Sequence, residues 1–486
     1  ELVGSYCNVL ALTLSAHQSI GVPQPLLLFG TDAQKREWLP RIAKGAISAF
    51  ALTEPQVGSD PASMATTAAP VDGGAAYVIN GEKLWCTNGV IADVLILMAR
   101  VPGPGEGAGK ITAFIVDMKT PGIELLRRCE FMGNRGIENA WLRLDGVRVP
   151  AENVLGELGR GLRIALTTLN AGRISLAALC LGMAQQLFEP TVRWAGLRQT
   201  FGKPIGKHEL ITHKLARMAA DVYAMQAVTW LVSGMIDRTH SDFRVESAVA
   251  KLFTSERLWS IADTAMQVRG GRAYETADSL RARGEDAPPI EQLMRDARLY
   301  LIGEGASEIL TLFIAREVMD PHLKRAAGFL SSNGAAKLGE AARLGRYYAP
   351  WYSKRLFSRS GQDVPATGDS QSQEHLRYVQ DCSRRLARVL FQTMVRYQGS
   401  LETRQGLVAR LSAIGVDLFV ITASALYAPH APNGRRLAQQ VFGDTRRRIE
   451  DHFRGLRDNE DEQTTALGLS VLEGNYAWLT AGAIPA

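Results

Sequence analysis

Apolar residues recur at helical spacing at both ends of the chain and give way to strand-like runs in between. Residues 1–45 predict helices joined by short connections. Gly30 followed by Thr31 and Asp32 predicts the end of one helix and the start of the next, because Gly favours a helix C-terminus and Thr or Asp favours an N-cap. Residues 34–43 are polar with apolar positions at helical spacing, so the second helix is expected to cover them.

Residues 46–150 have a different pattern. Short runs rich in strand-forming residues are separated by Gly, Pro and Asn, which predicts strands joined by turns. Together they predict an antiparallel β-domain of roughly 100 residues. The runs cover residues 75–80, 92–100, 110–117 and 140–149.

After Pro150 the helical spacing returns. One clear apolar stripe predicts a helix that faces a bundle core, and residues 161–320 are expected to form several long helices in a bundle. Residues 358–373 are polar and contain Gly and Pro, which predicts a linker, and residues 374–486 are helical again. The stripe consists of Leu215, Met218, Val222, Met225, Val228, Val232 and Met235.

This order predicts an α+β fold with N-terminal helices, a central antiparallel β-domain, a helical bundle and an additional C-terminal helical domain. Strands do not alternate with helices, which argues against a Rossmann-type sheet. The first part is expected to be incomplete, because the chain opens within a helical pattern. The predicted parts are residues 1–45, 46–155, 156–325 and 326–486.

Composition and charge refine this division. The chain has 486 residues, of which 46% are hydrophobic and 21% charged, so a mostly disordered, collagen-like or coiled-coil chain is excluded. Its net charge of +6 is uneven, since residues 321–486 hold 22 Lys and Arg against 15 Asp and Glu, whereas residues 1–320 hold 33 against 34. The predicted C-terminal extension is therefore basic and the rest nearly neutral.

The five cysteines are scattered and include no CxxC pair. This pattern disfavours a disulfide framework or a structural zinc site and favours a reducing, intracellular compartment. The eight histidines show no metal-ligand spacing, so no metal is predicted. No run of about 18 apolar residues is present to predict a membrane span.

Two glycine-rich segments resemble phosphate-binding motifs without meeting their requirements. Residues 103–110 (GPGEGAGK) are followed by Ile111 where a phosphate loop needs Ser or Thr, and they precede a strand instead of a helix, so they are interpreted as a hairpin loop. Residues 156–161 (GELGRG) have no surrounding βαβ unit. They are interpreted as a turn into a helix.

Four separated segments carry the candidate chemistry. Residues 51–60 (ALTEPQVGSD) lie before the first predicted strand, and residues 80–89 (NGEKLWCTNG) are interpreted as strand, turn and strand. Residues 198–202 (RQTFG) open a bundle segment. Arg295 and Asp296 precede the fourth segment, residues 304–309 (EGASEI).

At these segments, in this order and spacing, the sequence resembles the acyl-CoA dehydrogenase family. The resemblance covers residues 10–320, and the further helical domain resembles the extension of the very-long-chain branch. It implies a flavoprotein that uses FAD to convert a medium- to long-chain fatty acyl-CoA to trans-2-enoyl-CoA in fatty acid β-oxidation. Two alternatives are a DNA-binding flavoprotein relative with vestigial activity and an acyl-CoA oxidase-like enzyme that uses oxygen.

Glu304 stands just before an apolar-periodic helix. From the residues alone, its carboxylate can equally be a helix cap held by free amides and the dipole. The resemblance implies that it removes the α-proton while the β-hydrogen leaves as hydride to flavin N5, and that its backbone amide holds the thioester carbonyl. Burial would raise its pKa toward the working pH, whereas the dipole would lower it. Some family members carry the base at a position matching Arg173, which is cationic here, so Glu304 is expected to be the base.

The resemblance also implies the residues that hold FAD. Trp85 would cover the ring and suit electron transfer to a partner flavoprotein, although a buried strand aromatic is the alternative. Arg198 would reach the dinucleotide across a subunit interface, since its planar guanidinium suits pyrophosphate. The implied cofactor set is Phe50, Leu52, Thr53, Gly58, Ser59, Trp85, Cys86, Thr87, Arg198, Thr200, Phe201, Gln267, Gly270, Gly271, Ala306 and Glu308.

The implied substrate contacts are Ser59, Asn170, Arg173 and Gly305. Asn170 and Arg173 match the family's contacts to CoA, and their alternative is a pair on a helix surface. Two further residues, Ala11 and Ser15, are small and one turn apart, so they share a helix face. By resemblance this face closes the acyl pocket, although simple helix packing is slightly favoured.

Four positions depart from the family pattern. Val57 replaces a small residue, and Gly303 stands where an aromatic is usual. Ala306 replaces a Thr that commonly bonds the flavin. Ala273 replaces the third Gly of a G-G-x-G motif and is followed by an insertion around residues 281–289. These departures bear on turnover and substrate geometry.

The basic C-terminal extension mixes cations with aromatic residues. The favoured interpretation is a solvated helix face that packs on its own dimer; an anionic membrane surface comes second, and nucleic acid is least favoured. The expected partners are an acyl-CoA substrate, an electron-transferring flavoprotein and a second copy in a homodimer, in the bacterial cytoplasm or mitochondrial matrix. The mixed residues are Arg343, Arg346, Tyr347, Tyr348, Trp351, Tyr352, Lys354, Arg355, Phe357 and Arg359, with a second cluster at Arg446, Arg447 and Arg448.

Overall fold

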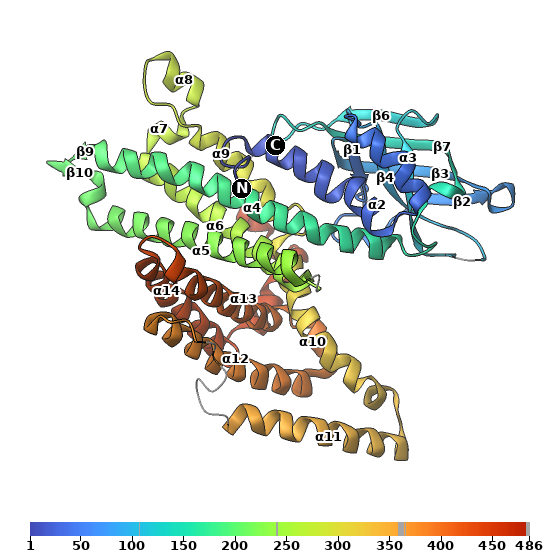
Figure 1. Cartoon of the computed structure of the whole chain (residues 1–486). Coiled ribbons are helices and arrows are strands. Elements are labelled where there is room, and N and C mark those ends of the chain that lie inside the picture. The colour runs from blue at the N-terminus through green and yellow to red at the C-terminus, as the bar shows by residue number, and fades with distance from the viewer. Residues whose placement is uncertain (106, 240–241, 358–363, 365, 483–486) are drawn as a thin grey trace. The chain divides into compact units, whose positions relative to one another are not determined.

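The structure is a computed structural model that forms two compact units (Figure 1). Unit 1 comprises Glu1–Leu310 and His430–Gln440, and unit 2 comprises Thr311–Pro429 and Val441–Ala486. The predicted order of N-terminal helices, β-domain, helical bundle and further C-terminal helices is confirmed. The described residues are 1–105, 107–239, 242–357, 364 and 366–482.

The N-terminal helices begin and end where local signals predict. Helix α2 ends before Gly30, and α3 begins after Thr31 with a capping box. The Gln34 amide donates to Thr31 Oγ1 at 3.2 Å, and the Thr31 amide donates to Gln34 Oε1 at 3.0 Å, so both exposed donors are satisfied. The elements are α1 (Asn8–Leu14), the π-helix η1 (Ser15–Ile20), α2 (Pro23–Phe29) and α3 (Asp32–Ala43).

The β-domain is an eight-stranded sheet in the order β6-β7-β3-β2-β4-β5-β8, with β1 paired to β4. The four predicted runs correspond to β3, β4, β5 and β7. The predicted β-domain is confirmed and most of its strand pairs are antiparallel. The sheet is nevertheless mixed, because β1 and β2 each pair with β4 in parallel; the long connections from each to β4 allow this pairing. The strands are β1 (Ser48–Ala51), β2 (Thr67–Val71), β3 (Ala76–Thr87), β4 (Val94–Arg100), β5 (Ile111–Asp117), β6 (Ile123–Arg128), β7 (Asn139–Pro150) and β8 (Val154–Leu155).

Two of the candidate segments lie differently from the prediction. Residues 80–89 do not form strand, turn and strand, since β3 continues to Thr87 with register shifts at residues 79–81 and 83–86. The Asn-Gly pair therefore marks a bulge where a turn was expected. Residues 51–60 follow the first strand instead of preceding it.

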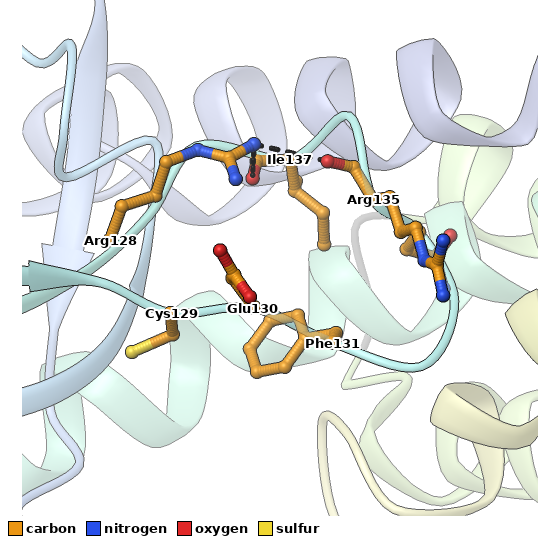
Figure 2. A pocket seen from close by; sticks show the side chains of 7 residues that line it. Arg128, Cys129, Glu130, Phe131, Arg135 and Ile137 are labelled. Carbon is orange, nitrogen blue, oxygen red and sulfur yellow. Dashed lines mark hydrogen bonds between the residues drawn. The ribbon is translucent and has the colours of Figure 1, made fainter.

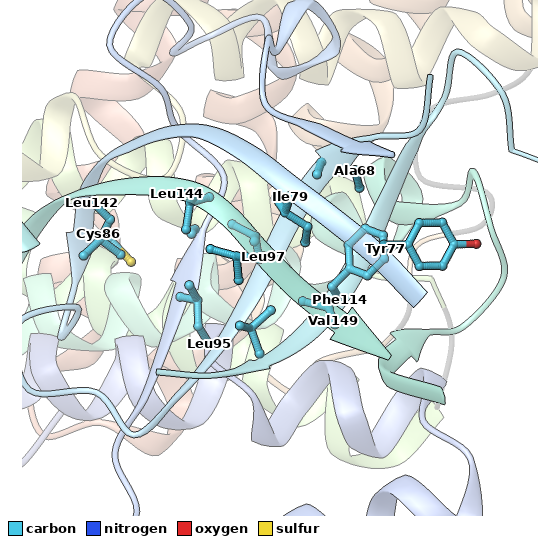
Figure 3. Packing of buried hydrophobic residues seen from close by; sticks show 14 of the residues in the cluster. Ala68, Tyr77, Ile79, Cys86, Leu95, Leu97, Phe114, Leu142, Leu144 and Val149 are labelled. Carbon is cyan, nitrogen blue, oxygen red and sulfur yellow. The ribbon is translucent and has the colours of Figure 1, made fainter. Parts of the chain in front are cut away.

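Strand β4 explains how the sheet is buried on both faces. Its residues Leu95 and Leu97 join a core within the β-domain, where Tyr77 and Phe114 meet edge to face at 5.2 Å (Figure 3). The alternate residues Val94, Ile96 and Met98 join a second core beneath the N-terminal helices. A strand with period two presents both faces to apolar neighbours, which accounts for its unbroken hydrophobic run.

The bundle of unit 1 is formed by three long helices that lie side by side, α4, α5 and α6 (Figure 1). The centre of the predicted stripe on α5 is buried at Met218, Met225, Val228 and Val232. The described residues of the first glycine-rich segment, 103–105 and 107–110, lie between β4 and β5, and the second segment forms a turn into α4, as predicted. The bounds are α4 (Gly161–Leu197), β9 (Gln199–Thr200), β10 (Lys203–Pro204), α5 (Glu209–Thr239), α6 (Arg244–Arg269), α7 (Gly271–Tyr274), α8 (Ala277–Ala282), α9 (Ile290–Ala297), η6 (Arg298–Leu301) and α10 (Ser307–Ser331).

Unit 2 has its own helical core. Cys382, Ile414, Phe442 and Ile449 belong to one buried cluster, and His375 stacks on Phe442 with ring centroids 4.1 Å apart. The remaining helices are α11 (Gly334–Phe357), α12 (Ser370–Tyr397), α13 (Gln405–Tyr427), α14 (Gly434–Gly455) and α15 (Asp461–Leu472).

Short 3-10 turns occur in both units. They lie at Pro61–Ser63, Asp72–Gly74, Ala151–Asn153, Ile205–Lys207, Gln398–Thr403, Ala428–His430 and Ala477–Thr480.

The predicted linker at residues 358–373 ends earlier than expected. Its residues 358–363 and 365 lie outside the described part of the chain. Asp369 Oδ2 accepts from the Ser372 amide at 2.9 Å, so α12 already begins at Ser370. Polar composition alone did not distinguish a linker from a capped first turn.

Two segments in the described part of the chain are long and apolar enough to cross a membrane, Gly161–Leu197 and Gln405–His430. In each, more than half of the most apolar window is buried inside the protein. Core helices have this property without any membrane, so the two segments are weak evidence for a span.

Candidate active site

Glu304 lies in the turn between η6 and α10. It has a positive φ of 58°, and Gly305 follows at 97°. Its Oε2 is inaccessible to solvent and has no hydrogen-bond partner among the described residues, which does not fit a satisfied helix cap. Burial raises the pKa of Glu304, and the nearby charges of Arg173 and Lys251 offset that rise only in part.

Helix α4 lies against this carboxylate. A Cβ built on Gly172 would be 3.6 Å from Glu304 Oε2 and 2.7 Å from the Ile20 side chain, so the backbone of α4 at Gly172 lies close to the carboxylate. Arg173 Nη1 donates to Asn170 Oδ1 at 3.0 Å, and both residues are buried. The interpretation of Asn170 and Arg173 as a surface pair is therefore wrong.

The segments at residues 50–59 and 80–89 lie side by side. The Leu84 amide donates to the Thr53 carbonyl at 2.9 Å, and Cys86 Sγ donates to the Phe50 carbonyl at 3.4 Å. Thus Phe50, Leu52 and Thr53 are brought next to Trp85, Cys86 and Thr87. The Cys86 thiol is buried, which raises its pKa to about 12, and it faces the core of the sheet.

Trp85 projects outward from this arrangement. It lies at a register shift of β3, has a φ of 55° and is 56% exposed. The alternative of a buried strand aromatic is therefore wrong. Thr87 Oγ1 accepts from Asn139 Nδ2 at 3.1 Å, and Gly58 and Ser59 are exposed on the first segment.

The third segment forms a small hairpin of β9 and β10. Phe201 stands at its tip with a φ of 48° and 95% exposure. Arg198, Arg269 and Arg272 surround the Trp194 ring, with Cζ-to-centroid distances of 6.0, 4.9 and 5.4 Å. Gln267, Gly270 and Gly271 are exposed, and a Cβ on either glycine would meet nothing within 4 Å. Arg269 pairs with Asp286 at 3.4 Å with its side chain 1% exposed, and Arg272 pairs with Glu285. Arg198, beside the open backbone, is therefore the guanidinium of this group that best fits an anionic ligand.

A polar pocket of about 370 Å³ lies in the loop between β6 and β7 (Figure 2). Its Cys129 accepts a hydrogen bond from the Trp85 backbone. Arg128 holds the pocket loop through the Arg135 and Ile137 carbonyls at 3.0 and 3.3 Å. The pocket does not include Glu304. It is lined by Arg128, Cys129, Glu130, Phe131, Asn134, Arg135 and Ile137.

Other expectations concern the cysteines and metals. All five cysteines are free in this structure. No group of three or more His, Cys, Asp or Glu that could hold a metal ion occurs among the residues the structure describes.

Three family models match successive parts of the chain. They are the N-terminal domain of acyl-CoA dehydrogenase at residues 1–46, its middle domain at 49–147 and its C-terminal domain at 159–319. The probable acyl-CoA dehydrogenase FadE10 of Mycobacterium tuberculosis is 47% identical over 99% of this chain and 76% of its own length. The chain belongs to the acyl-CoA dehydrogenase family. It is therefore an acyl-CoA dehydrogenase, a flavin-dependent oxidoreductase, as the resemblance implied.

Further family members match beyond these three domains. The bovine mitochondrial very long-chain specific acyl-CoA dehydrogenase is 33% identical over 95% of this chain and 71% of its own length. The crystal structure of an acyl-CoA dehydrogenase complexed with FAD from Bacillus anthracis covers 96% of this chain and 79% of that chain, with a TM-score of 0.76 and 26% identity. The C-terminal helices are thus shared with relatives.

Two departures from the family pattern have structural explanations. Val57 is buried with Trp38 and Met64 in the core beneath the N-terminal helices, so a larger residue fills space there. Ala273 lies inside the short helix α7, where it is buried, and this conformation needs no glycine. The insertion after it is fixed by ion pairs between Arg272 and Glu285 and between Arg283 and Glu275.

Two buried lysines that support the site were not predicted from the sequence. Lys83 is fully buried and its Nζ lies 2.8 Å from Glu54 Oε1, with a second hydrogen bond to the Leu52 carbonyl at 3.2 Å. Lys251 is also fully buried and donates to the Gly305 carbonyl at 2.7 Å. Lys251 stands inside an apolar segment, whereas Lys83 follows the polar residues 80–82. The sequence alone does not distinguish either lysine from an exposed one.

Asp296, which was named from the sequence, is also buried. It accepts from Asn8 Nδ2 at 2.9 Å and from the Asn134 amide. Tyr300 donates to Asn134 Oδ1 at 3.3 Å. This network ties the pocket loop to α1 and α9, so Asp296, which precedes the fourth segment, has a structural explanation.

Proposed function

We propose that this acyl-CoA dehydrogenase oxidises medium- to long-chain fatty acyl-CoA to trans-2-enoyl-CoA in fatty acid β-oxidation, with Glu304 as the base and FAD as the cofactor. The observation that carries this proposal is the buried Glu304 Oε2 without a hydrogen-bond partner among the described residues. A carboxylate kept out of water has a raised pKa and is a stronger base than one in solution.

In the proposed reaction, Glu304 takes the proton from the carbon next to the thioester carbonyl. The Glu304 backbone amide binds the thioester oxygen and stabilises the charge that develops there. Bound FAD supplies the acceptor for the hydride that leaves the β-carbon, and the carbon–carbon double bond forms between the two positions. Asn170, Arg173, Gly305 and Ser59 are proposed to contact the substrate.

The two adjoining segments and Arg198 fit FAD. The exposed face of Trp85 suits a flat ring, and the planar guanidinium of Arg198 suits the pyrophosphate. Gly270 and Gly271 leave room for close approach of the backbone. We propose that Gln267, Thr200, Ala306 and Glu308 complete the set named from the sequence.

Replacement of Arg198 by Met is expected to weaken FAD binding by about 10-fold or more, because a hydrogen bond to a charged group is worth about 1.5–3 kcal/mol. The measurement is equilibrium FAD binding by apoprotein. Lys203→Met, on the neighbouring strand of the same hairpin, is the matched control and should bind FAD as the unaltered protein does. Equal affinities of both variants would contradict a role for Arg198.

We propose a homodimer in which the hairpin reaches a second copy. The support is Phe201, whose 95% exposure at the hairpin tip leaves a large apolar side chain in water. In that arrangement Arg198, Thr200 and Phe201 would contact the dinucleotide of the partner.

The acyl pocket is proposed to lie along η1. The support is that a Cβ built on Gly172 would lie 2.7 Å from the Ile20 side chain and 3.6 Å from Glu304 Oε2, so the end of η1 and the base are both near Gly172. Ser15 begins this π-helix, and its buried Oγ has no hydrogen-bond partner among the described residues. π-Helical turns are frequent at functional sites, and the small side chains of Ala11 and Ser15 would leave the pocket deep.

Anaerobic titration with acyl-CoAs of graded length tests the substrate class. We expect medium and long chains to reduce bound FAD faster than butyryl-CoA, because each methylene buried in an apolar pocket contributes about 0.8 kcal/mol. A rate that falls from butyryl-CoA onward would contradict the assignment. No reduction by any chain, together with salt-sensitive DNA binding, would favour the vestigial DNA-binding alternative.

The proposed electron acceptor is an electron-transferring flavoprotein that docks near Trp85. Its addition should reoxidise the reduced enzyme faster than dissolved oxygen does. Rapid formation of peroxide without that protein would instead favour the oxidase-like alternative.

The basic extension is proposed to contact a dimer partner, with peripheral membrane contact as the second possibility. Internal pairing accounts for part of its charge: Arg448 pairs with Asp417 at 2.7 Å, Arg447 pairs with Asp444, and Arg355 lies 3.8 Å from the Trp351 ring centroid. Such pairing leaves a smaller basic surface than the sequence suggested. The five free cysteines support a reducing compartment, bacterial cytoplasm or mitochondrial matrix.

A further inference from the structure

Lys251 is a buried cation next to the proposed base. It lies in α6 with no exposed surface, and its Nζ donates to the Gly305 carbonyl at 2.7 Å. Isolated burial of an ammonium is costly unless it is paired and hydrogen-bonded. Burial accordingly lowers the pKa of Lys251 to about 8. A buried lysine beside the proposed base therefore needs a functional or structural explanation.

The hydrogen bond from Lys251 to Gly305 holds a turn in which two successive residues have positive φ. Glu304 and Gly305 have φ values of 58° and 97°, and a side-chain-bearing residue in this region costs on the order of 1 kcal/mol or more. Lys251 ties the second residue of the turn to a long helix of the bundle. The same turn orients the carboxylate and the backbone amide of Glu304. The hydrogen bond from Lys251 therefore helps to hold both groups in position.

The charges around the turn come from two helices. Arg173 on α4 and Lys251 on α6 both favour the ionised form of Glu304. Lys251 is itself faced by Cys180 on α4 and by Glu256 on its own helix, as well as by Glu304 and Arg173. Arg173 donates a hydrogen bond to Asn170 on its own helix. Lys251 instead donates to Gly305, in the turn that carries the base.

We propose that Lys251 is a positioning residue for the dehydrogenation: its hydrogen bond to Gly305 fixes the turn that carries Glu304, and its positive charge favours the ionised carboxylate. This inference rests on the proposed role of Glu304 as the base. It assigns two separable contributions, one geometric and one electrostatic, to a residue that does not itself touch the reacting atoms.

Two substitutions separate these contributions. Lys251→Gln keeps a donor but removes the charge, and Lys251→Met removes both. The measurement is the rate of FAD reduction by palmitoyl-CoA in a single anaerobic turnover across pH, with FAD content as the check on folding. Lys44→Met, at an exposed position after α3, is the matched control.

Loss of the charge should raise the pKa of Glu304, so the acid limb of the rate profile should move toward higher pH by about one unit or more in both variants. Lys251→Met should also lose about 10-fold or more at the pH optimum, because the turn is released. Lys251→Arg keeps the charge, so the acid limb of its rate profile should lie close to that of the unaltered protein. If Lys251→Met does not accumulate as FAD-bound protein, the Gln and Arg variants carry the test.

An acid limb that does not move in FAD-bound Lys251→Gln would overturn this inference. That result is distinguishable from failure of the base assignment, which concerns Glu304 alone. If Glu304→Gln still reduces FAD, the proposed function fails whatever Lys251 does. If Glu304→Gln is inactive while Lys251→Gln and Lys251→Met keep the pH–rate profile of the unaltered protein, only the proposed role of Lys251 fails.

Discussion

Glu304→Gln is expected to keep FAD bound and to slow its reduction by acyl-CoA by about 10²–10⁴-fold, the contribution of a positioned general base. The amide has nearly the same shape as the carboxylate and cannot take the α-proton. Because Glu304 Oε2 makes no hydrogen bond among the described residues, the exchange should leave the fold intact. The rate is measured by anaerobic stopped-flow absorbance of the bound flavin.

Glu209→Gln provides the control for removal of one negative charge. Glu209 opens α5 and its side chain is 85% exposed, so its loss should leave the reduction rate unchanged. Reduction of the Glu304 variant at the unaltered rate would refute the base assignment. Loss of FAD from that variant would show instead that Glu304 supports the cofactor site.

Lys83→Met is expected to lower the free energy of unfolding by about 3–5 kcal/mol, the usual cost of breaking a buried ion pair. The substitution leaves Glu54, which is only 5% exposed, without its cation. It also removes the donor to the Leu52 carbonyl, so FAD retention should fall. Denaturant unfolding and the FAD-to-protein ratio after gel filtration measure the two effects.

The double variant Glu54→Gln/Lys83→Met separates charge from packing. The change at Glu54 removes the unpaired negative charge, while the amide oxygen that replaces the carboxylate can still accept from the Ala65 or Thr66 amide, as Glu54 does at 2.6 and 3.0 Å. The double variant should therefore be more stable than Lys83→Met alone. Equal stability of Lys83→Met and the unaltered protein would contradict a structural role for the pair.

Local signals predicted those parts of the fold that depend on local interactions. The capping box at Thr31 and Gln34 satisfies amides within one turn, so sequence spacing was sufficient to find it. The α5 stripe was visible because its residues repeat with the helical period. By contrast, β1 has only four residues and pairs with β4, more than forty positions away in the chain, so no local pattern marks it.

The residues of the candidate site that belong to sequence motifs could be predicted. The residues that matter because they are buried could not. The resemblance named Glu304, Trp85 and Arg198, yet it gave no sign that Lys83 and Lys251 are buried. Lysine is almost always exposed, and its burial here results from segments that meet only in the folded chain. Glu54 and Lys83 are 29 residues apart, and Lys251 is 54 residues from Gly305.

The most direct test of the account is one anaerobic turnover of the yellow protein with palmitoyl-CoA, followed by mass analysis of the thioester. The account predicts one trans-2-enoyl-CoA per bound FAD, lighter than the substrate by two hydrogen atoms, with the flavin reduced in step. Recovery of unchanged palmitoyl-CoA beside oxidised flavin, with shorter and longer acyl-CoAs giving the same result, would contradict it.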